Sequence, residues 1–287
     1  MQESPQPLPG YFLDAENVAE MARLTKQAQF ISAITGLFPS EIDLSRVESI
    51  LDIGSGPGTW VLAVARDCPM KQILGIDISQ LMTSYASYLA TEQSLPRVAF
   101  RIMDVRQPLD PSIGRFDLIH LRFISFPTKE RWPVLLRECY QLLTPGGVLI
   151  STEGENLGIC TSPALTRYNT LLVEAARRLG QCWTSEGSNL GITAVQRHLL
   201  TQAGFINIRE IAHVQNASSG MPMHGVFYEN WVSLLKLLQP LLTGLGLASQ
   251  EELDLLYTRA LDEMRAPNFC HAGLFQTVWG EKPAGGE

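Results

Sequence analysis

The sequence lacks the cysteine patterns that hold metals or form redox pairs. It has five cysteines in 287 residues, an odd number, and no two of them form a Cys-x-x-Cys pair. This absence excludes the common zinc and dithiol motifs and predicts reduced thiols, as in a cytosolic protein. We therefore expect a cytoplasmic protein without a metal site.

Basic residues are also scarce, and long apolar runs are missing. There are 22 Lys and Arg against 29 Asp and Glu, a formal net charge of −7. Such a chain is poorly suited to neutralising a phosphate backbone, so we expect no nucleic-acid partner. The leucine-rich segment 234–247 is interrupted by Lys, Gln, Pro and Gly, and falls short of the roughly 20 apolar residues of a membrane helix. Residues 1–10 lack the pattern of a signal peptide. We expect no membrane partner.

What the sequence does contain is an alternation of short apolar strands with helical segments. This pattern is typical of a doubly wound α/β fold with a mostly parallel sheet. Strands are predicted at 49–53, 72–76, 99–103, 116–120 and 148–153, and the helices between them at 59–67, 80–92 and 129–143.

The regular alternation ends near residue 153, and a different organisation follows. Two further strands are predicted at 206–214 and 273–279, nearly sixty residues apart. A plain sheet edge needs only a short connection, so the intervening helices predict a cap over the ligand site. We divide the chain into an N-terminal helical segment (1–46), a cofactor-binding core (47–155) and a remainder (156–287). The expected cap insertions within the remainder are about 156–200 and 217–268.

The most informative local segment is a glycine-rich loop, Leu51–Thr59, between the first strand and a helix. Its glycines allow a tight turn and a close approach of the backbone to a ligand. Asp77 ends the second strand, 23 residues after Gly54, where an acid can hold ribose hydroxyls. The alternative reading of Asp77 is a helix N-cap. Loop and acid together predict a nucleoside-containing cofactor, either NAD or S-adenosylmethionine.

Two further features favour S-adenosylmethionine. The loop reads Gly-x-Gly-x-Gly, and Thr59 stands where a dinucleotide fingerprint has its third glycine. Asp104, after the third strand, can accept a hydrogen bond from an adenine amino group. With these motifs the chain resembles the class I S-adenosylmethionine-dependent methyltransferases. Segments 115–119 and 142–149 match the fourth strand and the turn before the fifth, in the family's order.

The resemblance implies a seven-stranded Rossmann-like sheet whose last strand, 273–279, is antiparallel. It also implies S-adenosylmethionine as cofactor and S-adenosylhomocysteine as product. The implied cofactor contacts are Gly54, Ser55 and Gly56 for the methionine part, Asp77 for the ribose, Ile78, Asp104 and Val105 for the adenine, Leu121 and Arg122 near the sulfonium, and Tyr11 and Gln27 from an N-terminal helix over the cofactor.

The reaction itself needs little fixed chemistry from the protein. Methyl transfer is a direct displacement on an activated carbon, so a general base is optional. His224, at the start of the second cap insertion, is the candidate base, whereas we expect His120, among apolar strand residues, to be a core histidine. The chain has His120-Leu-Arg-Phe where methyltransferases of nucleic-acid bases have Asn-Pro-Pro-aromatic. We therefore expect a metal-independent enzyme for a small organic acceptor, such as a natural-product intermediate.

Three alternatives remain open at this level. An NAD-dependent oxidoreductase shares the glycine loop and the strand-end acid. An enzyme of the same fold could catalyse a rearrangement or cyclisation, and a non-catalytic regulator could bind the cofactor alone. The chain could be a monomer, or a homodimer formed through the apolar segment 232–247.

Overall fold

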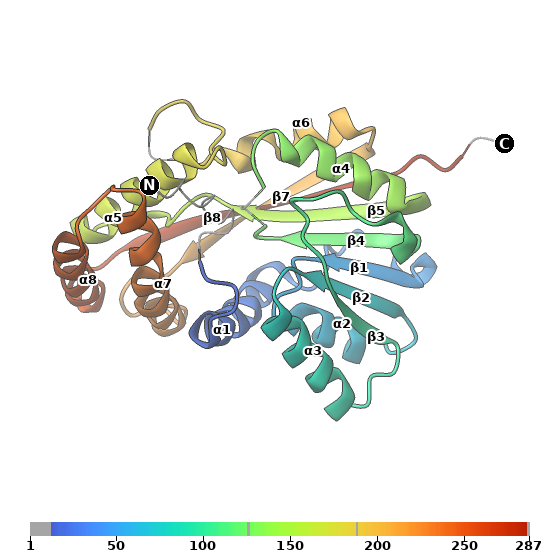
Figure 1. The fold of residues 1–287 in the computed structure, drawn as a ribbon, viewed down its shortest axis with the longest axis horizontal. Coiled ribbons are helices and arrows are strands. Elements are labelled where there is room, and N and C mark those ends of the chain that lie inside the picture. The colour runs from blue at the N-terminus through green and yellow to red at the C-terminus, as the bar shows by residue number, and fades with distance from the viewer. Residues whose placement is uncertain (1–12, 125–126, 188, 286–287) are drawn as a thin grey trace, which may run out of the picture.

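The computed structural model describes residues 13–124, 127–187 and 189–285, and its centre is a single mixed sheet (Figure 1). The strands are β1 (Ser49–Ile53), β2 (Gln72–Asp77), β3 (Val98–Ile102), β4 (Phe116–Arg122), β5 (Leu143–Gly154), β6 (Ile159–Cys160), β7 (Ile206–Asn216) and β8 (His271–Glu281). All seven predicted strands are present, and the two-residue β6 is an addition.

The strand order is β3-β2-β1-β4-β5-β8, with β7 on the outer side of β8 and β6 beside its first residues. The strands β1 to β5 pair in parallel, and β8 runs antiparallel to β5 and β7. This confirms the predicted doubly wound sheet with an antiparallel last strand. The order reverses between β1 and β4, the place where open α/β sheets bind ligands at the carboxyl ends of their strands.

Eight α-helices surround the sheet in the described part of the chain. They are α1 (Val18–Thr35), α2 (Thr59–Asp67), α3 (Gln80–Glu92), α4 (Arg131–Leu142), α5 (Pro163–Arg178), α6 (Ile192–Ala203), α7 (His224–Gly244) and α8 (Gln250–Arg265). None of these helices is long and apolar enough to cross a bilayer.

The helices form two layers on the sheet and a separate group at one end. Alternating strand residues separate the two faces: Leu51 and Ile119 pack with α4 and α6, whereas Ile50 and Leu118 pack with α2. The helices α5, α7 and α8 form the separate group, which has an apolar core of its own (Figure 1). The expected cap insertion 156–200 is therefore divided, because α5 joins the cap while α6 packs beside α4 on the sheet.

The N-terminal helix α1 connects the sheet layer and the cap, since it packs against both α2 and α7. Its N-cap is Asn17, whose side chain accepts from the Ala19 amide, and Gly36 ends it. Asp14, which also precedes the helix, accepts instead from the Glu16 amide.

Candidate active site

A cavity of about 290 Å³ opens at the carboxyl ends of the parallel strands, between the glycine loop, α1 and the cap. Its lining includes a residue at or just after the end of each of four strands: Gly54 after β1, Asp77 of β2, Arg122 of β4 and Glu153 of β5. These residues are far apart in sequence and meet here because parallel strands end at one edge.

The glycines of the loop serve two different purposes. Gly54 has φ = +71°, and a Cβ at this position would lie 2.7 Å from the Cγ2 atom of Ile124. Gly58 has φ = +77°, and its Cβ would lie 2.7 Å from Phe100 and 2.8 Å from Ala86. Gly54 thus shapes the wall of the cavity, whereas Gly58 lets a helix start close against β3 and α3.

Asp77 faces the cavity with its carboxylate held by two backbone amides. Its Oδ2 accepts from the Gly56 amide (2.8 Å) and its Oδ1 from the Ser79 amide (2.9 Å). The N-cap of α3 is Ser79, whose hydroxyl accepts from the Met82 amide, so the N-cap reading of Asp77 does not apply. Burial raises the pKa of Asp77 in spite of these hydrogen bonds, and the negative charge of Asp52 adds to the increase.

The segment after β3 contributes apolar surface and one ion pair. Val105 is buried and lines the cavity together with Met103 and Arg106. Asp104 is not among the lining residues, and it pairs with Arg106 through two contacts of 2.9 Å. Partial burial acts to raise the pKa of Asp104, but the hydrogen bonds and charge of Arg106 outweigh it and lower the pKa.

A buried histidine stands beside the glycine loop. The Nδ1 of His120 donates to the Asp52 carboxylate (2.7 Å), and its ring stacks on Trp60 at 3.8 Å between centroids. Burial lowers the pKa of His120, and its hydrogen bond to the Asp52 carboxylate opposes this effect. His120 is buried as expected, yet all three residues also line the cavity, which the sequence analysis did not foresee.

Of the two residues expected near the sulfonium, Arg122 lines the cavity and Leu121 does not. Leu121 is fully buried in the core beside α4. Arg122 donates to the Ser32 hydroxyl of α1 (2.9 Å), and burial lowers the pKa of its guanidinium to about 10.

The helix α1 closes the cavity through a polar network. Arg23 pairs with Glu20 on the same helix (2.6 Å) and donates to both Gln27 and Asn230, each at 3.0 Å. Because Asn230 lies on α7, this network joins the two helices over the cavity. Gln27 lines the cavity as expected. Tyr11, the other contact expected from this region, lies outside the described residues.

The candidate base His224 lies away from this cavity. It begins α7, and its Nδ1 donates to the carbonyl oxygen of Ala217 (3.0 Å). It is not among the residues that line the cavity, so the geometry gives its proposed role no support.

Glu153 is a buried acid that the sequence analysis overlooked. Its side chain lines the cavity, the residue is 1% exposed, and its Oε1 accepts from the Ile124 amide (3.0 Å). Within the described chain, its carboxyl group has no other hydrogen bond and no ion pair. Burial raises the pKa of Glu153 to about 8. A carboxyl group in this state can exchange a proton near neutral pH.

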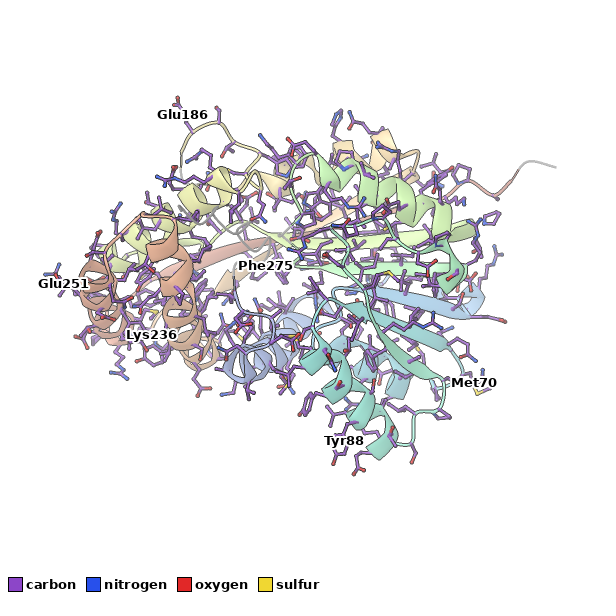
Figure 2. The ribbon with its side chains drawn as sticks, in the orientation of Figure 1. Met70, Tyr88, Glu186, Lys236, Glu251 and Phe275 are labelled. Atoms are coloured by element: carbon purple, nitrogen blue, oxygen red, sulfur yellow. The ribbon has the colours of Figure 1, made fainter. Side chains whose placement is uncertain are left out.

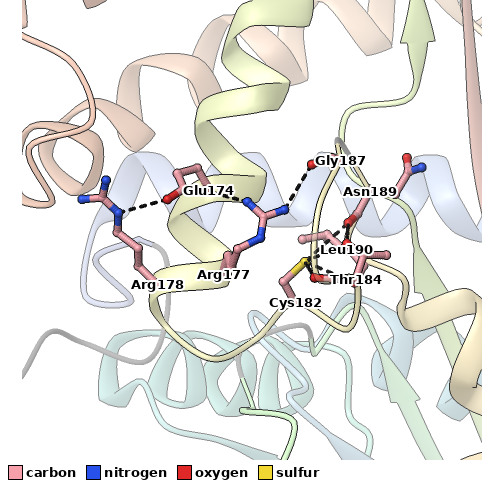
Figure 3. Close-up of polar contacts among 8 residues, drawn as sticks. All are labelled: Glu174, Arg177, Arg178, Cys182, Thr184, Gly187, Asn189 and Leu190. Atoms are coloured by element: carbon pink, nitrogen blue, oxygen red, sulfur yellow. Dashed lines mark hydrogen bonds and ion pairs between the residues drawn. The ribbon is translucent and has the colours of Figure 1, made fainter.

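Leu190, in the segment after α5, adds to the wall of the cavity. Figure 3 shows the polar contacts of this segment. Arg177 bridges Glu174 (2.6 Å) and the carbonyl oxygen of Gly187 (3.1 Å), which holds the segment against α5. The thiol of Cys182 points inside the turn, toward the carbonyl oxygen of Asn189 (3.4 Å). Among the residues that the structure describes, no group of three His, Cys, Asp or Glu side chains could hold a metal ion.

Comparison with known proteins identifies the family. Residues 50–147 match the methyltransferase domain family. The chain is 32% identical over 207 residues to the N-methyltransferase verN of Clonostachys rogersoniana, covering 69% of this chain and 66% of verN. It is 28% identical over 169 residues to the methyltransferase str2 of Strobilurus tenacellus, covering 58% of each. The chain spans about half the length of the curated relatives it matches.

The solved structures agree on the fold. Phosphoethanolamine N-methyltransferase 2 of Haemonchus contortus, in complex with S-adenosylhomocysteine, aligns with a TM-score of 0.52 at 19% identity, over 97% of this chain and 62% of that one. The present chain belongs to the class I S-adenosylmethionine-dependent methyltransferases. The cofactor of this family is S-adenosylmethionine.

Proposed function

We propose that this protein transfers the methyl group of S-adenosylmethionine to a small organic acceptor without a metal ion. The observation that carries the proposal is one continuous cavity. It joins the glycine loop and the strand-end acids to an apolar chamber beneath the cap. A donor and an acceptor bound in one cavity can be aligned for the transfer.

The electrostatics of the cofactor end fit this cofactor. Asp77 lines the cavity without a basic partner in the described chain, and the charges of Asp52 and Glu16 both act to raise its pKa. An end rich in carboxylates suits a ligand that carries a sulfonium and an ammonium group. The same carboxylates would repel the pyrophosphate of NAD. The geometry therefore supports S-adenosylmethionine over the oxidoreductase alternative.

The residues at this end have distinct roles in the proposal. Asp77 holds the ribose hydroxyls. Ile78 and Val105 pack against the adenine, and Asp104 acts there through its pairing with Arg106. The remaining groups are assigned to the methionine part: the backbone of Gly54, Ser55 and Gly56, with Asp52 for the amino group and Arg122 for the carboxylate.

When bound, the cofactor supplies a methyl carbon on positively charged sulfur, so the chain need not activate the leaving group. What the residues contribute is position. The loop and Asp77 hold the donor, and the α1–α7 network of Arg23 and Asn230 keeps the cavity closed.

The proposals on partners and location rest on charge and composition. The net charge of −7 argues against a nucleic-acid partner, and unpaired cysteines fit the cytoplasm. The segment 232–247 supplies Leu235, Leu238, Leu241 and Leu242 to the core of the cap. That packing supports a monomer over a homodimer formed through this segment.

A calorimetric titration tests the cofactor. Wild-type protein is titrated with S-adenosylmethionine, S-adenosylhomocysteine and NAD, beside Asp77→Ala and the exposed control Asp262→Ala. We expect saturable binding of the first two ligands, a loss of at least about tenfold in affinity in Asp77→Ala, and no change in the control. Binding of NAD but of neither adenosyl compound would contradict the proposal.

A further inference from the structure

We call the part of the cavity that the cap helices α5 and α7 line the acceptor chamber. Its walls are mostly apolar and include Leu172, Leu190, Phe227, Leu234, Leu238 and Phe275. Phe275 lies where the sheet meets the cap (Figure 2). Apolar walls select an acceptor with an apolar body.

The charges around the cavity disfavour an anionic acceptor. Three arginines are among the described lining residues. Arg23 is paired with Glu20 and Arg106 with Asp104, and Arg122 lies at the cofactor end beside Asp52. An acceptor carboxylate in the chamber would thus lose its hydration without gaining a free cation.

Two buried polar groups of the chamber have no hydrogen-bond partner in the described chain. Gln215 is 5% exposed and its Nε2 is unpaired, and the indole Nε1 of Trp231 is unpaired as well. Both side chains line the cavity. A buried donor without a partner is unfavourable, so each such group in a native protein calls for an explanation, and a bound ligand that accepts from it is one.

These two groups belong to one region of the chamber. The centroid of the Phe227 ring lies 5.5 Å from that of Trp231 and 4.1 Å from that of His271. Gln215 adjoins His271, because the Oε1 of the first and the Cε1 of the second lie 3.3 and 3.4 Å from the position of a Cβ on Gly273. Both unpaired donors thus adjoin the same pair of aromatic rings, Phe227 and His271, and they form the polar part of the chamber wall there.

Glu153 marks the opposite limit of the chamber, next to the glycine loop. Ile124 connects them: its side chain abuts Gly54, and its amide donates to the Glu153 carboxyl group. The second carboxyl oxygen has no hydrogen bond in the described chain. An O–H or N–H of the acceptor that donates to this oxygen is thereby placed at the donor side of the cavity.

We propose that the acceptor is an uncharged, apolar molecule with two polar groups: an oxygen that accepts from Gln215 and Trp231, and an O–H or N–H that donates to Glu153 and is the site of methylation. This inference rests on the proposed methyl transfer. In the step, the acceptor heteroatom forms a bond to the methyl carbon and the carbon–sulfur bond breaks with its electron pair left on sulfur. The proton of the acceptor moves to Glu153 in its ionised form, which a pKa of about 8 makes the minor form at neutral pH.

A matched set of naphthalene probes tests the proposal on the full chain saturated with S-adenosylhomocysteine. The probes are 6-acetyl-2-naphthol, 6-ethyl-2-naphthol, which lacks the carbonyl oxygen, and 6-hydroxy-2-naphthoate, which is anionic. Binding is followed by probe fluorescence. We expect the acetyl compound to bind about tenfold more tightly than either of the other two, because one hydrogen bond changes the affinity by about this factor.

Substitutions in the chamber show which residues cause the preference for the acetyl over the ethyl compound. In Gln215→Met the acetyl and ethyl compounds should bind equally, and in Trp231→Phe the preference should shrink. Trp183→Phe is the control, because the Trp183 indole N–H is also buried and unpaired but lies outside the cavity lining. Glu153→Gln should keep the preference but release at least about tenfold less S-adenosylhomocysteine when S-adenosylmethionine and the acetyl compound are supplied. Unchanged affinity for S-adenosylhomocysteine shows that each variant is folded.

The outcomes separate the two proposals. The acceptor inference is wrong, and methyl transfer stands, if S-adenosylhomocysteine binds but one of three results is found. These are that Gln215→Met still prefers the acetyl to the ethyl compound, that the naphthoate binds best, or that no probe shows saturable binding. If wild-type protein does not bind S-adenosylhomocysteine, the proposed function itself fails.

Discussion

The buried carboxyl group of Glu153 makes the folding stability of this protein depend on pH. Burial raises its pKa from an ordinary value of 4.5 to about 8. The unfolded chain regains the ordinary value, so between these two pKa values the unfolded state releases a proton that the folded state keeps. The protonated Glu153 carboxyl group therefore makes its full contribution to the free energy of unfolding below pH 4.5. This contribution is lost as the pH rises from 4.5 through about 8.

The size of this loss follows from the two pKa values. One pKa unit corresponds to about 1.4 kcal/mol, so the ionisation of Glu153 in the unfolded chain lowers the free energy of unfolding by about 1 kcal/mol at pH 5, about 3 at pH 7 and about 5 at pH 9, relative to strongly acidic solution. Glutamine has nearly the same shape and cannot ionise. The stability of Glu153→Gln relative to wild type should thus increase by about 4 kcal/mol between pH 5 and pH 9.

Urea denaturation at pH 5, 7 and 9, without ligand, measures this difference. Glu186→Gln serves as the control, because Glu186 is exposed (Figure 2) and its replacement should leave the pH profile of wild type unchanged. A constant difference between Glu153→Gln and wild type at all three pH values would show that the carboxyl group is not buried in an uncharged form.

Three other substitutions test separate parts of the structure. Gly58→Ala should lower the free energy of unfolding by about 2–4 kcal/mol in urea, because its Cβ would overlap side chains of α3 and β3. Arg23→Met removes the cation that pairs with the buried Glu20 and should cost about 3 kcal/mol in the same assay, and a loss below about 1 kcal/mol would contradict the role of the ion pair. His224→Ala should change the rate of S-adenosylhomocysteine release with 6-acetyl-2-naphthol less than about twofold, since His224 lies outside the cavity lining. A larger loss would restore His224 as the candidate base.

The fold was largely predictable because its signals are local. The helices at 59–67 and 80–92 occur at the predicted bounds, since apolar periodicity and capping residues act within one or two turns. The glycine loop is equally local: the backbone geometry at Gly54 and Gly58 requires glycine whatever the rest of the chain does. Such signals predict elements well, but they say little about which elements meet.

The site was predictable where it depends on one loop and one strand end, and unpredictable where it depends on packing. His120 was expected to be a core residue, but its pairing with Asp52 joins residues 68 positions apart. Glu153 carried one signal that could have been used. A charged residue near the carboxyl end of a buried parallel strand, in the same sheet as the strands that precede Gly54 and end at Asp77, points toward the same edge of the sheet. His224 was chosen for its place in the chain, which does not reveal its contact with Ala217.

This contrast explains why the cofactor is easier to infer than the acceptor. The cofactor end is built from connections between successive strands, so its residues occur as short motifs in residues 51–105. The acceptor chamber is built from Gln215 of β7, Trp231 of α7 and Glu153 of β5, which no spacing rule relates. Relatives can therefore share the donor end while their chambers select different molecules. The hydrogen-bonding groups left unpaired in the chamber carry the information on the acceptor that the motifs do not.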